Sequence, residues 1–257
     1  MSSGKERSAA VITGAARGVG AAAARRFSDA GHDVILLDID DAGVAVAEEV
    51  GGTFYKHNVS SAADWAALEK QMRDKHAPLQ SLVNNAAIEG RFDFADIPLE
   101  KWNQTLSVNL TGAFLGSQFG VRMMRAHSVD LPCAIVNVAS IGAHMTLATD
   151  APYSASKGGL ISLTKSVATY CGLKRLGIRC NVISPGAIKT EMMAQFIATS
   201  PDPAATEKAL SALQPVGYMA TPANIANLIH YLTTEQSEFV TGAEIVIDGG
   251  AMSSANM

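Results

Sequence analysis

The chain has 257 residues, of which 48% are apolar and 17% are charged, with a net charge of −4. We expect one domain, 1–257, with a large core and a polar tail at 1–8. With no basic cluster and no apolar run of about 18 residues, nucleic-acid and membrane partners are not expected. The three cysteines lack metal-ligand spacing and no secretory leader is visible, so we expect a cytoplasmic protein without a metal.

The first predicted unit is a strand, a glycine-rich turn and a helix. The apolar run Ala9–Thr13 leads into Gly-Ala-Ala-Arg-Gly-Val-Gly at 14–20, and an alanine-rich segment follows. Such a turn lets backbone N–H groups and a helix N-terminus approach a phosphate. An ordinary turn between a buried strand and a helix is the alternative. On the first interpretation, the cofactor-binding residues here are Gly14, Arg17, Gly18, Val19 and Gly20.

The second strand, 33–37, ends on Asp38, 18 residues after Gly20. A carboxylate at this point accepts hydrogen bonds from the ribose hydroxyls of an adenosine and repels a 2′-phosphate, which favours NAD. Ile39 is included in the same expected site. Asp38 could instead cap the next helix. Arg17 slightly favours NADP, because a guanidinium beside the phosphates could bind an additional phosphate group.

Strands and helices continue to alternate along the chain. The predicted segments are 53–56, 62–75, 81–83, 99–126, 134–139, 178–183 and 244–247. This pattern predicts an α/β fold, a doubly wound parallel sheet of about seven strands with helices on both faces. Ligands bind at the carboxyl edge of such a sheet, where we expect Asn58, Val59, Asn85 and Ala86 beside the nucleotide. Asparagines that only form turns are an equal alternative for Asn58 and Asn85.

The stretch 151–157 reads Ala-Pro-Tyr-Ser-Ala-Ser-Lys and is predicted to begin a helix, because Pro152 suits a first turn. Tyr153 and Lys157 are four residues apart and therefore share one helix face. A lysine cation held close lowers the pKa of a phenol, so the pair can donate and accept a proton. Because Tyr-x-x-x-Lys is frequent by chance, the pair gains meaning only from Ser140 and the loop 184–190, which are expected at the same sheet edge.

Together these residues resemble the short-chain dehydrogenase/reductase family in its single-domain form. The matching motifs run in order from Ala9 to Gly250: Thr13-Gly-x-x-x-Gly-x-Gly20, Asn84-Asn-Ala86, Asn109, Ser140, Tyr153-x-x-x-Lys157, Asn181 and Pro185-Gly186 through Thr190. The resemblance implies a Rossmann-like sheet and a nicotinamide cofactor. It adds to the cofactor site Tyr153, Lys157, Pro185, Gly186, Ile188 and Thr190.

The resemblance also implies a catalytic tetrad. In it Asn109 supports a water, Ser140 polarises the carbonyl, Tyr153 passes the proton, and Lys157 holds the ribose and tunes Tyr153. Two positions depart from the family pattern, since Asn58 stands where aspartate is usual and Ala87 where glycine is usual.

The expected activity is that of an NAD-dependent dehydrogenase (EC 1.1.1.-) acting on a small apolar secondary alcohol or ketone, cyclic, aromatic or steroid-like. Stretches 87–92 and 141–149 and a lid at 190–217 should line its pocket. The lid contributes Met192, Met193, Phe196 and Ile197, and Glu89 or His144 supplies a polar group.

Three alternatives stay open: a 3-oxoacyl-carrier-protein reductase, a sugar or polyol dehydrogenase, and a nucleotide-sensing regulator without enzymatic activity. The helices expected around 101–125 and 158–173 resemble those through which family members pair. A homo-oligomer, dimer or tetramer, is therefore expected.

Overall fold

The computed structural model describes residues 8–127, 132–146 and 148–253. The tail expected at 1–8 lies outside this part of the chain except for Ser8, and so does Leu147 within the expected pocket wall. In the described residues, no helix combines the length and apolar character needed to span a membrane.

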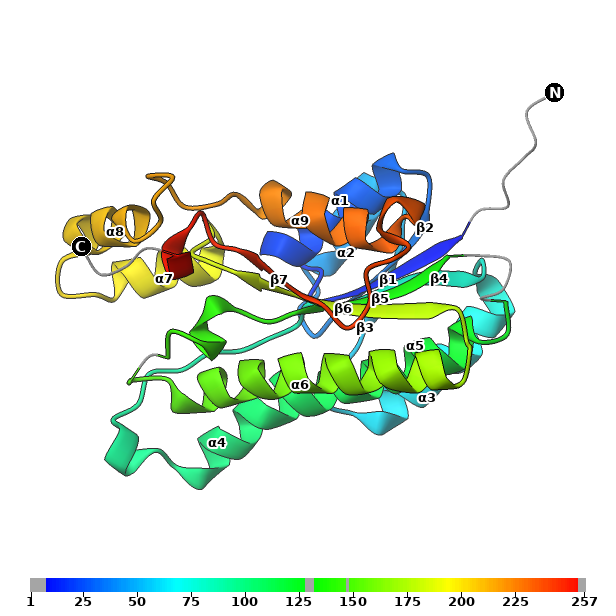
Figure 1. Cartoon of the computed structure of the whole chain (residues 1–257), viewed down its shortest axis with the longest axis horizontal. Helices are drawn as coiled ribbons and strands as arrows, with labels where there is room; N and C mark the ends of the chain where they lie inside the picture. Colours follow the sequence, from blue (N-terminus) through cyan, green and yellow to red (C-terminus); the bar gives the residue numbers. More distant parts are fainter. Residues whose placement is uncertain (1–7, 128–131, 147, 254–257) are drawn as a thin grey trace.

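Seven strands form one parallel sheet in the order β3-β2-β1-β4-β5-β6-β7 (Figure 1). They are β1 (Ala9–Thr13), β2 (Asp33–Asp38), β3 (Thr53–Lys56), β4 (Leu79–Asn84), β5 (Cys133–Val138), β6 (Ile178–Pro185) and β7 (Glu244–Ile247). The predicted α/β fold is thereby confirmed. The order reverses direction between β1 and β4, and the crevice at such a point is where open parallel sheets bind ligands.

Helices cover both faces of the sheet (Figure 1). One layer consists of α1 (Gly18–Asp29), α2 (Gly43–Val50) and α9 (Pro222–Thr233), and the other of α3 (Ala62–Lys75), α4 (Leu99–Leu106), α5 (Gly112–Met124) and α6 (Ala151–Leu173). Because side chains alternate along a strand, Ala10 and Ile12 of β1 pack into the first layer, and Ala9 and Val11 into the second. Strands buried on both sides explain the continuous apolar runs in the sequence.

Two further helices, α7 (Glu191–Ala198) and α8 (Pro203–Ala212), lie together at one end of the molecule, beyond the carboxyl edge of the sheet (Figure 1). None of their residues is buried. The segment expected as a lid at 190–217 thus contains two helices that remain at least partly exposed along their length. Short 3₁₀ helices occupy Phe94–Asp96, Ile141–Ala143, Glu235–Ser237 and Ala251–Ser253.

The helix predicted over 99–126 extends from Leu99 to Met124, but it is not α-helical throughout. A π-helical segment, η2 (Ser107–Thr111), separates α4 from α5. This segment buries Asn109, whose Oδ1 accepts the Ile88 N–H and whose Nδ2 donates to the Ile88 carbonyl, both at 2.8 Å. Insertions of this kind are frequent at functional sites, and a hydrophobic pattern does not reveal them.

Candidate active site

The glycine-rich turn leaves the N-terminus of α1 open. No side chain among the described residues caps this helix, so the N–H groups of Gly18, Val19 and Gly20 in its first turn are available to an anion. Gly18 has a φ of +55°, which favours glycine, and a Cβ at Gly20 would collide with the carbonyl oxygen of Gly14. The backbone therefore fits the diphosphate of a dinucleotide.

Asp38 joins this turn to the end of β2. Its Oδ2 accepts the Ala16 N–H at 2.9 Å, and its Oδ1 accepts the Asp40 N–H at 3.0 Å. The alternative in which Asp38 caps α2 is wrong, because that helix begins at Gly43 without a side-chain cap. Arg17 forms an ion pair with Asp40, so its positive charge is already balanced. Ile39, next to Asp38, is exposed.

The two asparagines expected beside the nucleotide hold the protein's own turns. Asn85 Nδ2 donates to the carbonyl oxygens of Thr13 and Gly14 at 3.0 and 3.1 Å. Asn58 Oδ1 accepts from the N–H and the hydroxyl of Ser60 at 3.1 and 2.7 Å. The structure therefore favours the turn alternative for both residues.

Two neighbouring residues of the expected cofactor site lie in the same region. Ala86 donates its N–H to Thr13 Oγ1 at 3.0 Å, and Val59 is buried and accepts the indole N–H of Trp65 through its carbonyl oxygen at 2.8 Å. Ala86 thus follows β4 directly beside the end of β1, and Val59 supports the loop after β3.

The loop after β6 returns to the glycine-rich turn. Pro185 ends β6, Gly186 donates its N–H to Ile247 at 3.0 Å, and Ile188 forms a bridge with Ala220. Thr190 caps α7 by accepting the Met193 N–H at 3.2 Å. A Cβ on Gly18 would lie 3.5 Å from Thr190 Cγ2. The structure therefore brings these two loops, far apart in sequence, to one crevice.

Ser140, Tyr153 and Lys157 meet at the end of β5. Lys157 is buried, and its Nζ donates to the Val138 carbonyl at 2.7 Å and lies 5.4 Å from the centre of the Tyr153 ring. Ser140 Oγ accepts the Gly142 N–H at 3.0 Å and forms a hydrogen bond with Tyr153. The first turns of α6 thus hold the phenol and the ammonium beside the serine hydroxyl.

The pKa values of this pair move toward the neutral forms. Burial lowers the pKa of Lys157 to about 8. Burial also raises the pKa of Tyr153 to about 12, the Ser140 hydrogen bond opposes this shift, and Glu89 and Asp150 add to it. The lowered pKa expected for Tyr153 is therefore not found for the protein's own groups, because desolvation of the phenol is the largest effect on it.

Asp150 is a site residue that the sequence analysis missed. It is buried and caps α6, with Oδ1 accepting the Tyr153 N–H at 3.3 Å and Oδ2 accepting the Gly90 N–H at 3.1 Å. It therefore fixes the start of the tyrosine helix against the loop after β4. An aspartate two residues before a proline is a helix-start signal that would have found it.

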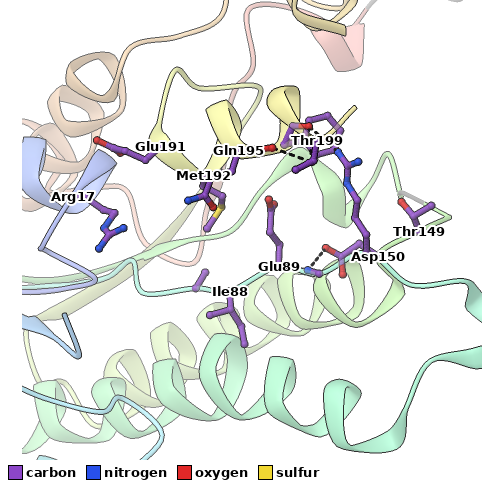
Figure 2. A pocket seen from close by; sticks show the side chains of 13 residues that line it. Arg17, Ile88, Glu89, Thr149, Asp150, Glu191, Met192, Gln195 and Thr199 are labelled. Atoms are coloured by element: carbon purple, nitrogen blue, oxygen red, sulfur yellow. Dashed lines mark hydrogen bonds between the residues drawn. The ribbon is translucent and has the colours of Figure 1, made fainter. Parts of the chain in front are cut away.

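A cavity of about 460 Å³ lies beside these residues, between the loop after β4 and α7 (Figure 2). Loop 87–91 and the α7 residues Met192 and Phe196 line it, as expected, whereas Met193, Ile197 and His144 do not. His144 is bonded instead to Glu244 Oε1 at 2.6 Å. Of the wall expected at 141–149, the described residue in the lining is Thr149.

The lining surface is mostly apolar, as expected, but it also holds more charged side chains than the sequence indicated. The charged side chains in its lining are Arg17, Glu89, Arg91, Asp150 and Glu191. Across residues 8–127, 132–146 and 148–253, no group of three or more His, Cys, Asp or Glu side chains is placed to hold a metal ion.

Comparison with known proteins gives the family. A family model described as Enoyl-(Acyl carrier protein) reductase matches residues 14–252. The NADP-dependent (R)-specific alcohol dehydrogenase of Lentilactobacillus kefiri is 34% identical over 248 residues, which cover 94% of this chain and 95% of that protein. The chain belongs to the short-chain dehydrogenase/reductase family.

Two further matches cover nearly the whole chain. The 3-alpha-(or 20-beta)-hydroxysteroid dehydrogenase of Mycobacterium bovis is 36% identical over 247 residues, covering 95% of this chain and 88% of that protein. The ligand-free structure of Thermoplasma acidophilum aldohexose dehydrogenase superposes with a TM-score of 0.89 at 26% identity, covering 98% and 96% of the two chains. This member of the short-chain dehydrogenase/reductase family is thus an oxidoreductase.

Proposed function

We propose that this enzyme transfers a hydride between NAD(H) and a secondary alcohol or its ketone, with Tyr153 as the proton donor and acceptor. The observation that carries the proposal is the convergence of Ser140, Tyr153 and Lys157 at the sheet edge, beside a cavity and an open helix N-terminus. The nicotinamide, when bound, supplies or accepts the hydride, while the protein supplies position and electrostatics.

Each tetrad residue has a task that follows from its contacts. The hydroxyls of Ser140 and Tyr153 meet the negative charge that develops on the substrate oxygen. Lys157 donates one N–H to the Val138 carbonyl, which leaves two N–H donors for ribose hydroxyls. Asn109 forms hydrogen bonds with the backbone of Ile88 and with Ser156 Oγ at 3.1 Å. We therefore assign it two roles, which are to position the cavity-lining residue Ile88 and to support a water.

NAD as the preferred cofactor is supported by two charges near the adenosine end of the crevice. Asp38 presents a carboxylate at the end of β2, and each of its oxygens keeps a second lone pair for a ribose hydroxyl. Asp40 neutralises Arg17, the nearby cation that would otherwise attract a 2′-phosphate. The Lentilactobacillus relative is named for NADP, so its charges at this end of the site should differ from these.

The apolar surfaces of Met192 and Phe196 and the names of the alcohol and hydroxysteroid dehydrogenases support a cyclic, aromatic or steroid-like substrate. Glu89 and Gln195 in the lining, with the likeness to aldohexose dehydrogenase, support a sugar or polyol as the second candidate. A screen of cyclic and aromatic ketones, hydroxysteroids, aldohexoses and 3-oxoacyl thioesters, each with NADH and NADPH or their oxidised forms, tests both. Higher kcat/KM for sugars, or for thioesters with NADPH, would overturn the first choice.

We also propose that the enzyme is a cytoplasmic homo-oligomer. Phe114 on α5 and Tyr170 and Leu173 on α6 are large apolar side chains that remain exposed, on the helices expected to pair. The three cysteines are free and buried, which suits a reducing compartment. Light scattering after size-exclusion chromatography should give a dimer or tetramer, and a monomer at micromolar concentration would contradict this assembly.

A further inference from the structure

Glu89 extends from the loop after β4 into the cavity, toward Met192 and Gln195 of α7 (Figure 2). Its carboxylate makes no hydrogen bond or ion pair with any residue that the structure describes. Burial raises its pKa, Asp150 adds to this shift, and Arg91 opposes it. A carboxylate in this position is free to meet a substrate.

The other charged side chains of the lining are already engaged. Arg91 Nη2 donates to the Phe196 carbonyl at 3.2 Å, and its guanidinium lies 3.8 Å from the centre of the Phe196 ring. Asp150 accepts two backbone N–H groups, and Arg17 pairs with Asp40. Each of these side chains is therefore held in place by other protein groups, whereas the Glu89 carboxylate is not.

Glu191 lies on another side of the cavity. Its Oε2 is 3.7 Å from the place a Cβ on Gly18 would take, which puts it by the glycine-rich turn and not by Tyr153. Glu89, in contrast, is close enough to Tyr153 to raise the pKa of that phenol. Glu89 is thus the free carboxylate nearest to the proton donor in this lining.

We propose that Glu89 is a specificity-determining residue that favours alcohols and ketones bearing an ammonium group near the reacting carbon, accepts neutral ones, and disfavours those bearing a carboxylate. A fixed negative charge in a partly closed cavity attracts a cation and repels an anion, and discrimination is the sum of the two effects. The inference rests on the proposed function, because it assigns the substrate class of the same site.

Three matched ketones test it: 4-(aminomethyl)acetophenone, 4-methylacetophenone and 4-acetylbenzoate. We expect kcat/KM for the ammonium ketone to exceed that for the carboxylate by about tenfold. Glu89→Gln should bring the ratio close to one, and Glu89→Lys should reverse it. Glu207→Gln, on α8 and outside the lining, is the matched control and should leave the ratio unchanged.

Direct binding separates this inference from the proposed function. In calorimetric titrations, benzylamine should bind the wild-type protein more tightly than benzoate, and Glu89→Gln should remove the difference. If no ketone is turned over but benzylamine is still preferred, the proposed function fails and the role of Glu89 stands. Equal binding of the two probes by the wild-type protein, or a ketone ratio that Glu89→Gln leaves intact, would overturn the role of Glu89.

Discussion

Replacing Asp38 by asparagine is expected to move the cofactor preference toward NADPH. A 2′-phosphate brings up to about two negative charges to within hydrogen-bonding range of this carboxylate. One charge pair at 4 Å is worth about 1 kcal/mol in water and about 4 kcal/mol near a protein surface. Asp38 is half-buried and salt screens part of the repulsion, so we expect a net penalty of about 1 to 3 kcal/mol, or about 5- to 150-fold.

The same substitution has a structural effect that must be measured separately. Asp38 accepts the N–H groups of Ala16 and Asp40, so the neutral amide weakens two charge-assisted hydrogen bonds of the glycine-rich turn. We expect a loss of about 1 kcal/mol in the free energy of unfolding. Urea denaturation of Asp38→Asn would show this loss, while kcat/KM for the two cofactors would show the change in preference.

Asp40→Asn is the matched variant at the neighbouring position. It frees Arg17, whose ion pair is exposed and therefore worth only about 0 to 1 kcal/mol, so NADPH use should rise by no more than about fivefold. The wild-type enzyme decides the matter. If the kcat/KM of the wild-type enzyme for NADPH equalled or exceeded that for NADH, the reasoning from Asp38 and Arg17 would be refuted.

Three further results are expected. Tyr153→Phe should lower kcat by about a thousandfold, because it removes the transferable proton and keeps the ring. NADH binding, measured by fluorescence, should change little. If the variant kept most of its kcat, another group would have to be the proton donor. Burial lowers the pKa of His57 from 6.5 to about 4, so between these pH values the unfolded chain binds a proton that the folded chain does not. The free energy of unfolding should therefore fall by up to about 3 kcal/mol as the pH drops from 6.5 to 4. Urea denaturation of His57→Gln should show a weaker pH dependence in this range, and an unchanged dependence would contradict the prediction. Arg91→Ala removes both contacts with Phe196 and should raise KM for the ketone several-fold more than it lowers kcat. If kcat fell by as large a factor as KM rose, Arg91 would also act in the chemical step.

The fold was predictable because strands that are buried on both faces of a parallel sheet appear in the sequence as continuous apolar runs. The run at β2 is apolar throughout its buried part, and Gly14 and Gly20 mark a turn where backbone closely approaches backbone. The bounds of α3 and β7 agree with the predicted segments to the residue. The π-helical segment at Asn109 was not predictable, since its side chain is bonded to the distant backbone of Ile88 and no local pattern encodes that contact.

The site was predictable only in part. Spacing along α6 gives the Tyr153 and Lys157 pair, because position on a helix fixes direction. The cavity depends instead on contacts between distant segments, such as that of Arg91 with Phe196, 105 residues apart, and no local pattern encodes them. The sequence could not show which α7 side chains face the cavity for the same reason: α7 buries none of its residues, so its apolar pattern does not distinguish Met192 and Phe196 from Met193 and Ile197.

The charges around Tyr153 bear on the direction in which the enzyme works. Its ammonium neighbour Lys157 is buried and bonded to Val138, while the carboxylates of Glu89 and Asp150 act on the phenol from the cavity side. The protein's own groups therefore hold Tyr153 protonated at neutral pH, which is the form that donates a proton to a ketone oxygen. Alcohol oxidation would need the deprotonated form, which a positively charged nicotinamide would stabilise if it were bound beside Tyr153. On the proposed function, we therefore expect the pH of maximal kcat for ketone reduction to lie below the pH of maximal kcat for alcohol oxidation, and coincident pH profiles would contradict this.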